Sequence, residues 1–441
     1  MTNQRVIKNV AVIGSGTMGA GIAALCANAG CRTLLLDIDK SLADKAVERM
    51  QGGRSPMLDD PKALELLNAG SIDDDLDSIS DYNWICEVVV ENLDIKRDIF
   101  TKIENARSDG SIVTTNTSGI PLRSIYAGMP QRLRNDIAVT HFFNPVKIMR
   151  LVELVPGEDT TDDVKQSLAD FLGKKLGKGV VHAKDTVNFI GNRIGCYWIL
   201  AGLHKGKIAR QKGLSMETID ALMSTPMGFP PTGLYGLADL IGLDVMGLVA
   251  ANLVENLPKD DAGREFTSLP VEEQAMLDDG QLGRKTGGGF YRVTKNDDGS
   301  KLKETFNPDT KQWAVAQTPT LDAAHSGYKS LMFSNDEQGQ FAWDVMSSTL
   351  CYAADLIPEI SDDVVNIDRA MRWGFAWARG PFEMLDALGS QEIIQRLNEE
   401  NRAIPSTLKL LVDSGNDSFY QNNGAEYFGV DGQYHAVPPE K

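Results

Sequence analysis

The stretch Gly14-Ser15-Gly16-Thr17-Met18-Gly19 decides the fold of the N-terminal part of the chain. It follows a β-rich apolar run at 6–13 and opens a run of small residues, 20–29, that has the composition of a buried helix. A second β-rich run at 32–36 comes next and ends at Asp37. The order strand, glycine turn, helix, strand predicts a βαβ unit.

The spacing of the glycines in this turn is that of a dinucleotide-binding motif. Gly14 permits the tight turn, Gly16 lets a pyrophosphate approach the backbone, and Gly19 lets the helix pack closely on the strand. We expect Thr17 and Met18, in the first turn of the helix, to face the phosphates, because a helix N-terminus favours negative charge. A purely structural turn is the alternative interpretation.

Asp37 predicts which dinucleotide binds. A carboxylate at this strand end would accept hydrogen bonds from the adenine ribose and repel a 2′-phosphate, so it favours NAD over NADP. Lys40 lies close enough in sequence to help bind a phosphate, which leaves NADP as the alternative cofactor. A solvated Asp37 without a ligand is the second alternative.

Short apolar runs recur along the first 184 residues. They lie at 84–90, 111–115, 137–143 and 151–155, with helical segments between several of them. This alternation predicts an α/β, Rossmann-like doubly wound sheet, which we expect to end near residues 180–184. Ligands of such a sheet bind at the carboxyl ends of its strands.

After Asp185 the pattern becomes helical and contains an internal repeat. Asp220 and Asp239 are 19 residues apart, and Asp368 and Asp386 are 18 residues apart, in matching apolar and glycine surroundings. The repeat predicts two duplicated all-α domains after the sheet. We therefore expect residues 1–184 to form the Rossmann domain, 185–293 a first helical domain, 294–338 a polar insert or linker, and 339–441 a second helical domain.

Composition and charge exclude several classes of protein. With 441 residues and 42% hydrophobic residues, the chain is expected to fold into two to four globular domains. Lys and Arg number 44 against 61 Asp and Glu, and the net charge of −17 argues against nucleic acid as a partner. The five cysteines contain no CxxC pair, so we expect no metal site, no disulfide framework and a cytoplasmic location. The polar N-terminus and the lack of an apolar run of about 18 residues predict neither a signal peptide nor a membrane span.

His141 is the candidate proton acceptor. Oxidation of an alcohol by a nicotinamide requires a base near neutral pH, which suits histidine. Of the five histidines, only His141 closes a predicted strand on the expected ligand side of the sheet.

Glu153 is the candidate carboxylate that would orient the ring of His141 and stabilise its cation. It lies inside the apolar run 151–155, where an unpaired charge would be costly to bury. Strand alternation alone is equally compatible with a Glu153 side chain that faces solvent.

Six short motifs follow one another between residue 5 and about residue 292. They are Val10–Gly21, Val90-Glu91-Asn92 with Lys96, Asn116-Thr117-Ser118, His141–Val146 with Glu153, Lys184-Asp185-Thr186 with Phe189–Arg193, and Lys285-Thr286-Gly287 with Gly289-Phe290-Tyr291. In this order they resemble the L-3-hydroxyacyl-CoA dehydrogenase family of fatty-acid β-oxidation. The string His-Phe-Phe-Asn-Pro with a Glu twelve positions after the His is the most specific part of the resemblance.

The resemblance implies that the chain oxidises an L-3-hydroxyacyl-CoA to a 3-ketoacyl-CoA with NAD, or catalyses the reverse reaction. It implies that His141 is the base and Glu153 its orienting carboxylate. It also implies that Ser118 and Asn192 hold oxygen atoms of the substrate. Taken without the resemblance, Ser118 reads as a helix cap and Asn192 as a helix-surface residue.

The resemblance further implies that Glu91, Lys96 and Asn116 contact the cofactor. Residues 40–81 depart from the basic helical stretch that meets CoA in single-domain relatives. Two other functions stay open at this point. One is a β-hydroxyacid dehydrogenase that uses Lys in place of His, and the other is a non-catalytic protein that binds NAD or CoA.

The C-terminal repeat resembles the second helical domain of multifunctional fatty-acid oxidation proteins. The resemblance is closer to a bacterial type in which the dehydrogenase precedes an enoyl-CoA hydratase domain. It implies an acyl-CoA substrate and, as protein partners, enoyl-CoA hydratase and thiolase components. Helical domains of single-copy relatives pair between subunits, so two copies in one chain predict a monomer, with a dimer as the alternative.

Overall fold

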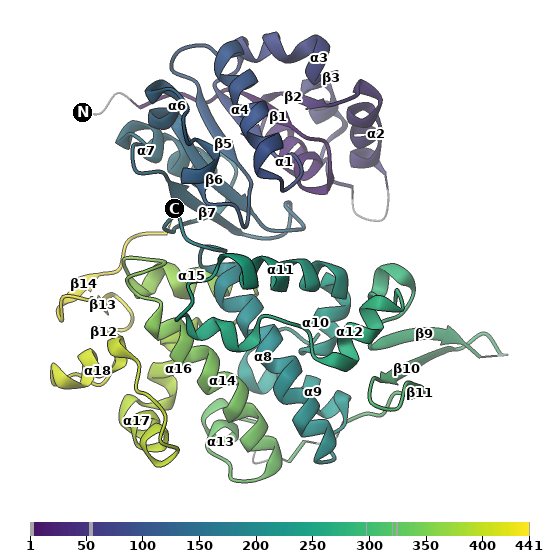
Figure 1. The fold of residues 1–441 in the computed structure, drawn as a ribbon, viewed down its shortest axis with the longest axis vertical. Helices are drawn as coiled ribbons and strands as arrows, with labels where there is room; N and C mark the ends of the chain where they lie inside the picture. The colour runs from purple at the N-terminus through teal and green to yellow at the C-terminus, as the bar shows by residue number, and fades with distance from the viewer. Residues whose placement is uncertain (1–3, 53–55, 297, 320, 323–324, 441) are drawn as a thin grey trace. The chain divides into compact units, whose positions relative to one another are not determined.

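The computed structural model describes residues 4–52, 56–296, 298–319, 321–322 and 325–440. Part of the segment that departs from the single-domain relatives, residues 53–55, lies outside the described residues. The chain forms two compact units (Figure 1). The first contains residues 4–190 with the short segments 359–361 and 438–440, and the second contains 191–358 and 362–437.

The first unit is built on one eight-stranded sheet with the strand order β3-β2-β1-β4-β5-β6-β7-β8. Neighbouring strands are parallel except β6 and β7, which are antiparallel. The strands are β1 (Asn9–Ile13), β2 (Arg32–Asp37), β3 (Leu67–Ser71), β4 (Trp84–Glu87), β5 (Ile112–Thr115), β6 (Ile137–Phe142), β7 (Leu151–Pro156) and β8 (Gly179–His182). The Rossmann-like sheet is therefore confirmed, and its last strand ends close to the predicted boundary.

The order of the strands places the ligand crevice. The chain runs from β1 outward to β2 and β3, and then returns to β4 on the other side of β1. Open α/β sheets bind ligands at such a reversal, outside the carboxyl ends of the strands. The glycine turn follows β1 directly, so it lies at this reversal.

Helices connect the strands of the sheet. They are α1 (Thr17–Asn28), α2 (Lys40–Gln51), α3 (Ile72–Asp75), α4 (Leu93–Ala106), α5 (Leu122–Ile125), α6 (Gln131–Asp136) and α7 (Asp162–Asp170). The small residues of α1 let it approach its neighbours closely, since a Cβ added to Gly21 would lie 2.8 Å from Cγ2 of Val146. Most of its side chains are buried, as its composition predicts.

The second unit is mainly helical. Its helices are α8 (Gly191–Gln211), α9 (Met216–Leu222), α10 (Tyr235–Ile241), α11 (Leu243–Asn256), α12 (Val271–Asp278), α13 (Tyr328–Met332), α14 (Glu337–Asp355), α15 (Val364–Gly374), α16 (Pro381–Leu388), α17 (Ser390–Glu399) and α18 (Ser406–Asp413). The two longest, α8 and α14, pack against each other.

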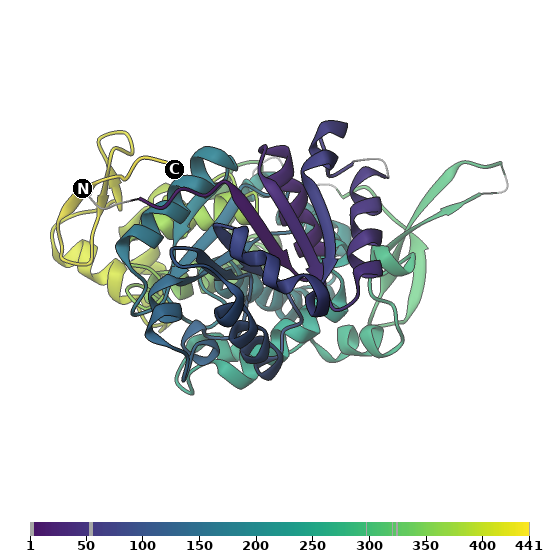
Figure 2. The same cartoon turned by 90° about the horizontal axis from the view of Figure 1, so that it is seen from above.

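Two small antiparallel sheets correct the expectation that this part is all-α. One consists of β9 (Tyr291–Lys295), β10 (Lys301–Asn307) and β11 (Gln312–Val315), and the other of β12 (Tyr420–Gln421), β13 (Glu426–Phe428) and β14 (Tyr434–Ala436). Figures 1 and 2 show the β9–β10 hairpin projecting from the helices of this unit.

The first of these sheets occupies much of the segment that we expected to be a poorly packed polar linker. Each face of this sheet mixes apolar with charged residues, since Leu302 and Phe306 share their face of β10 with Glu304, so its strands lack the clean apolar alternation by which strands are predicted. Cross-strand contacts hold the sheet together. Arg292 pairs with Glu304 at 2.8 Å and lies 4.0 Å from the ring centroid of Trp313.

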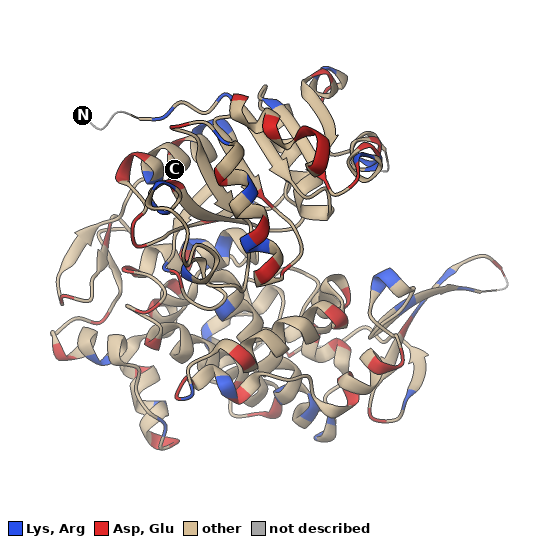
Figure 3. Ribbon diagram, turned by 45° about the horizontal axis from the view of Figure 1, so that its top comes forward, with Lys and Arg blue, Asp and Glu red and all other residues tan. Residues whose placement is uncertain are grey.

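Lys, Arg, Asp and Glu are interspersed over both units (Figure 3). Among the described residues, no single helix has the length and apolar composition of a membrane span. Helices α10 and α11 satisfy that test only when taken together, with a bend of 90° between them.

Candidate active site

His141 and Glu153 lie opposite each other on the antiparallel strands β6 and β7. Directly opposed residues of an antiparallel pair project to the same face of the sheet. Nδ1 of His141 is 2.6 Å from Oε2 of Glu153, and the two residues are 5% and 0% exposed. The alternative in which Glu153 faces solvent is therefore wrong, because the residues of β6 and β7 are buried on both faces of the sheet.

The second oxygen of Glu153 is also bonded. Its Oε1 accepts a hydrogen bond from the backbone N–H of Ile190 at 2.9 Å. Asn188 and Phe189, which precede Ile190, have φ values of 59° and 51°, in the left-handed region that turns the chain sharply. The same turn places the centroid of the Phe189 ring 5.7 Å from that of the His141 ring. The centroid of the Phe143 ring lies 4.6 Å from that of the His141 ring.

This geometry determines which nitrogen of His141 is basic. A carboxylate can only accept a hydrogen bond, so Nδ1 donates to Glu153 and the lone pair of the neutral ring lies on Nε2. Within the described part of the chain, Nε2 has no hydrogen-bond partner. The ring is thus oriented to take a proton at Nε2, with Glu153 ready to stabilise the resulting imidazolium.

The three glycines of the turn differ in what surrounds them. Gly14 has a φ of 110°, and an added Cβ would lie 2.5 Å from the carbonyl oxygen of Val88. At Gly19 an added Cβ would lie 1.8 Å from the carbonyl oxygen of Gly14. At Gly16 nothing lies within 4 Å of the added atom. Gly14 and Gly19 therefore serve packing, whereas Gly16 borders open space and its contact with a pyrophosphate stays a prediction.

The N-terminus of α1 has features of an anion site. Gly16 is its N-cap, so no side chain satisfies the first N–H groups, and no acidic residue lies in the first turn. Thr17 is exposed and Met18 half-buried at this end of the helix. These backbone donors fit a pyrophosphate.

Asp37 lies at the end of β2, beside the glycine turn. Its Oδ2 accepts hydrogen bonds from the backbone N–H and the hydroxyl of Ser15, at 2.6 and 2.5 Å. This contact fixes the carboxylate next to the turn. Its contact with a ribose stays a prediction.

Glu91 and Lys96 form one cluster with the turn that carries Ser118. Oε1 of Glu91 accepts hydrogen bonds from the Thr117 hydroxyl at 2.5 Å and from the backbone N–H groups of Ser118 and Gly119, both at 3.1 Å. Burial acts to raise the pKa of Glu91, but the nearby Lys96 charge and these hydrogen bonds outweigh it and leave that pKa below its usual range.

Lys96 also contacts Glu87, a residue that was not among the predicted site residues. Nζ of Lys96 lies 2.9 and 3.1 Å from the two carboxylate oxygens of Glu87, and 3.3 Å from Glu91. Glu87 closes β4, one of the strands that border the crevice. An acidic residue within the apolar run 84–90 was the available signal, and it is of the same kind that pointed to Glu153.

The other predicted contacts lie in different places. Asn116 follows β5, and its Oδ1 accepts a hydrogen bond from the N–H of Phe142, next to His141. Ser118 is half-buried, and it does not cap α5, whose N-cap is Pro121. Asn192 lies in the first turn of α8, in the other unit, so its approach to the substrate stays a prediction.

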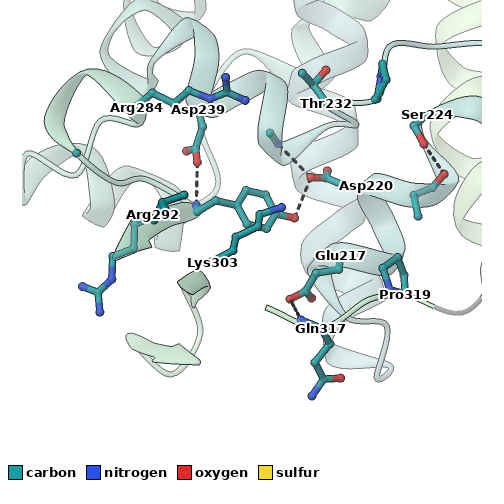
Figure 4. Close-up of a pocket in the computed structure, with 16 residues that line it drawn as sticks. Glu217, Asp220, Ser224, Thr232, Asp239, Arg284, Arg292, Lys303, Gln317 and Pro319 are labelled. Carbon is teal, nitrogen blue, oxygen red and sulfur yellow. Dashed lines mark hydrogen bonds between the residues drawn. The ribbon is translucent and has the colours of Figure 1, made fainter. Parts of the chain in front are cut away.

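A large cavity of about 910 Å³ lies within the second unit (Figure 4). Its carboxylates are bound to the protein itself. Asp220 accepts hydrogen bonds from the backbone of Leu234, Tyr235 and Gly236 and from the hydroxyl of Tyr291, and burial raises its pKa to about 7. These bonds hold the ends of helices and strands together, so we assign this cavity no part in the reaction.

The described residues contain no group of three or more His, Cys, Asp or Glu side chains that could hold a metal ion. The candidate site is therefore built from the His141–Glu153 pair, the glycine turn with Asp37, and the Glu87–Lys96–Glu91 cluster with Ser118.

Two family models match the chain. One, described as the NAD binding domain of 3-hydroxyacyl-CoA dehydrogenase, matches residues 9–186, and one described as the C-terminal domain of that enzyme matches residues 189–293. A Bacillus subtilis protein whose name is that of a 3-hydroxyacyl-CoA dehydrogenase is 34% identical over 99% of this chain and 58% of its own length. A Rickettsia prowazekii protein whose name describes a fatty acid oxidation complex trifunctional enzyme is 36% identical over 87% of this chain and 53% of its own length. The chain thus spans little more than half the length of these relatives.

Solved structures extend the comparison. The (S)-3-hydroxybutyryl-CoA dehydrogenase of Ralstonia eutropha is 30% identical, with a TM-score of 0.54 over 64% of this chain and 98% of that one. The 3-hydroxybutyryl-CoA dehydrogenase of Escherichia coli has a TM-score of 0.69 over 93% of this chain and 99% of that one. At 24% identity this second likeness shows the fold alone.

Proposed function

This chain belongs to the 3-hydroxyacyl-CoA dehydrogenase family, and from that premise we propose that it oxidises L-3-hydroxyacyl-CoA to 3-ketoacyl-CoA with NAD, in fatty-acid β-oxidation. The observation that carries the proposal is the buried pair of His141 and Glu153 at 2.6 Å. The pair argues against a relative that uses Lys as its base. It also argues against a protein that only binds NAD or CoA, because such a protein has no need of an oriented imidazole.

In the proposed reaction, Nε2 of His141 takes the proton of the substrate's 3-hydroxyl group. NAD, when bound, supplies the acceptor for the hydride that leaves C3. Glu153 holds the ring through Nδ1 and stabilises the imidazolium as it forms. Phe143 and Phe189 cover the ring with apolar surface, which limits access of water to the transferred proton. In the reverse direction, the same imidazolium would return the proton to the ketone oxygen.

We assign the NAD contacts to the edge of the sheet at the glycine turn. The open space at Gly16 and the uncapped N–H groups at Thr17 and Met18 suit the pyrophosphate. The Asp37 carboxylate would accept hydrogen bonds from the ribose hydroxyls by giving up or sharing its contact with Ser15. A 2′-phosphate would bring negative charge against this carboxylate, which favours NAD over NADP.

The remaining contacts concern the substrate and the cofactor. Ser118 and Asn192 would donate hydrogen bonds to substrate oxygens. Glu91, Lys96 and Asn116 are the remaining cofactor positions that the family resemblance implies. The Ser118 turn is already fixed by Glu91, so its hydroxyl needs little reorganisation to bind a substrate.

The second unit carries two copies of one helical domain in this proposal. Asp368 accepts hydrogen bonds from the backbone of Phe382 and Glu383 and from the hydroxyl of Tyr420, just as Asp220 does in the first copy.

The partner aspartates of the two copies also match. Asp239 binds the N–H groups of Phe290 and Tyr291, and Asp386 binds those of Phe419 and Tyr420. Packing of α8 on α14 would satisfy within one chain the pairing that single-copy relatives make between subunits, so we propose a monomer.

The proposal extends to partners and location. Enoyl-CoA hydratase and thiolase activities would supply the substrate and consume the product. The five cysteines are free thiols, which suits a reducing compartment such as the cytoplasm.

The test of the function is an assay of NADH formation from 3-hydroxyacyl-CoA thioesters of graded chain length, with wild-type protein and His141→Ala. The variant is expected to lose turnover by at least about 100-fold while NAD binding is kept. Full activity of His141→Ala would refute the proposed role of His141. Absence of NADH formation by the wild-type protein with every thioester would refute the proposed function itself.

A further inference from the structure

Glu87 has no role in the reaction as described so far, although it lies at the centre of the candidate site. It closes β4 and pairs in register with Ile13 of β1 on one side and Thr115 of β5 on the other. It is 0% exposed, and a buried carboxylate needs donors. The backbone N–H of Val89 and the hydroxyl of Thr115 donate to it, both at 2.6 Å, and Lys96 binds both of its oxygens.

Lys96 is buried, and its ammonium group is bonded within the protein. It is 1% exposed, and its ammonium contacts Glu87, the carboxylate of Glu91, and the carbonyl oxygen of Val89 at 3.5 Å. An ammonium has three protons to donate, and these acceptors account for them. These contacts give Lys96 a role in holding Glu91 in place.

Glu91 links Lys96 to the turn that carries Ser118. One of its oxygens faces Lys96, and the other accepts the three hydrogen bonds from residues 117–119. Its side chain is 40% exposed, unlike that of Glu87. Without Glu87, Lys96 keeps this half-exposed carboxylate as its one acidic partner among the residues that the structure describes. A buried ammonium with a weakened partner is drawn toward solvent. Lys96 and Glu91 would then shift together, and the turn with them.

We propose that Glu87 is a positioning residue of the active site, which acts through Lys96 and Glu91 to fix the backbone of the Ser118 turn. The statement that this turn meets the substrate rests on the proposed function. The chain of contacts from Glu87 to the N–H groups of Ser118 and Gly119 does not.

The first test measures, without a ligand, how strongly these contacts protect the backbone amides of the Ser118 turn. Amide hydrogen exchange in peptides spanning residues 116–120 is compared for wild type and Glu87→Gln. The variant keeps the shape of the side chain but removes its charge, and exchange of these amides is expected to be at least about tenfold faster.

Asp136→Asn is the matched control for this measurement. Asp136 is a buried carboxylate bound to Arg107 at 2.8 Å and to Arg5 at 2.6 Å, at the opposite end of β6 from His141. This control loses a comparable ion pair and should leave exchange in the 116–120 peptides unchanged.

If Glu87→Gln does not fold, the double variant Glu87→Gln/Lys96→Met replaces it. It leaves no buried ammonium without a partner, and it still releases Glu91. Wild-type protection of residues 116–120 in either folded variant would overturn the proposal. Equal loss of protection in Asp136→Asn would also overturn it, because the effect would then be general loosening of the unit.

The second test is a kinetic double-mutant cycle with Ser118→Ala, assayed by NADH formation. If Glu87 acts through the Ser118 turn, Glu87→Gln lowers kcat/KM at least about tenfold in wild type, and the loss is at least about threefold smaller in the Ser118→Ala background. Additive losses would overturn the link to Ser118. Complete inactivity of the wild-type protein would instead refute the proposed function, while the exchange measurement would still decide the positioning role.

Discussion

Replacing Glu153 by Gln tests the candidate catalytic pair with the smallest change in shape. The backbone N–H of Ile190 donates to Oε1 at 2.9 Å, and this bond decides how the new amide is oriented. The amide oxygen must face Ile190, because the opposite orientation would place two donors against each other. The amide NH₂ then faces Nδ1 of His141 and donates to it.

This orientation gives His141 the wrong tautomer. With Nδ1 accepting a hydrogen bond, the proton of the neutral ring moves to Nε2, which can no longer take a proton from the substrate. The variant also lacks the negative charge of Glu153, which stabilises the imidazolium in wild type. General-base catalysis contributes roughly 10²- to 10⁴-fold, and we therefore expect kcat to fall by about 10²- to 10⁴-fold. At about 1.4 kcal/mol per factor of ten, this corresponds to about 3–5.5 kcal/mol of transition-state stabilisation.

The assay is steady-state NADH formation, with NAD binding measured separately by titration calorimetry. Binding of NAD should be unchanged, since the glycine turn and Asp37 are not touched. Asp136→Asn serves again as control, because it removes a buried carboxylate of the same unit, at the end of α6, that pairs with Arg107 and Arg5. Turnover of Glu153→Gln within about threefold of wild type would refute the reasoning about the tautomer.

The other predictions concern the cofactor, acid stability and assembly. Gly16→Ala should weaken NAD binding at least about tenfold with an unchanged Tm. Gly19→Ala should instead lower the Tm, because its Cβ would lie 1.8 Å from a carbonyl oxygen. Calorimetry of NAD binding and thermal melts distinguish the two variants. Asp37→Arg should weaken NAD at least about tenfold and improve NADP, and an unchanged cofactor preference would reject the ribose contact. The pKa of Glu91 is lower in the folded protein than the value of 4.5 in the unfolded chain, so its carboxylate stabilises the fold above pH 4.5. This stabilisation is lost as the pH falls through the folded pKa. Glu91→Gln should therefore lower the Tm at pH 7 and match the Tm of wild type near pH 3. Light scattering should give the mass of one chain, and a tight dimer would contradict pairing of the two helical copies within the chain.

The N-terminal sheet and its glycine turn could be predicted because their signals are local. The positive φ at Gly14 and the close approach at Gly19 are requirements on two residues of one short turn, and glycine meets both. The same holds for His141, whose position at a strand end can be read directly from the run that precedes it. The β9–β11 sheet was missed for the opposite reason, because charged residues such as Glu304 interrupt the apolar alternation of its strands.

The amino-acid sequence alone thus specifies the turn, the strand ends and the chemical groups that stand there. Which of those groups contact one another depends on how the strands pair. The antiparallel register of β6 and β7 puts Glu153 against His141, and the parallel register of β1, β4 and β5 puts Glu87 between Ile13 and Thr115. Strand alternation fixes which side of its own strand a residue faces, but the neighbour across the sheet is set by pairing between distant segments. No local pattern carries that information.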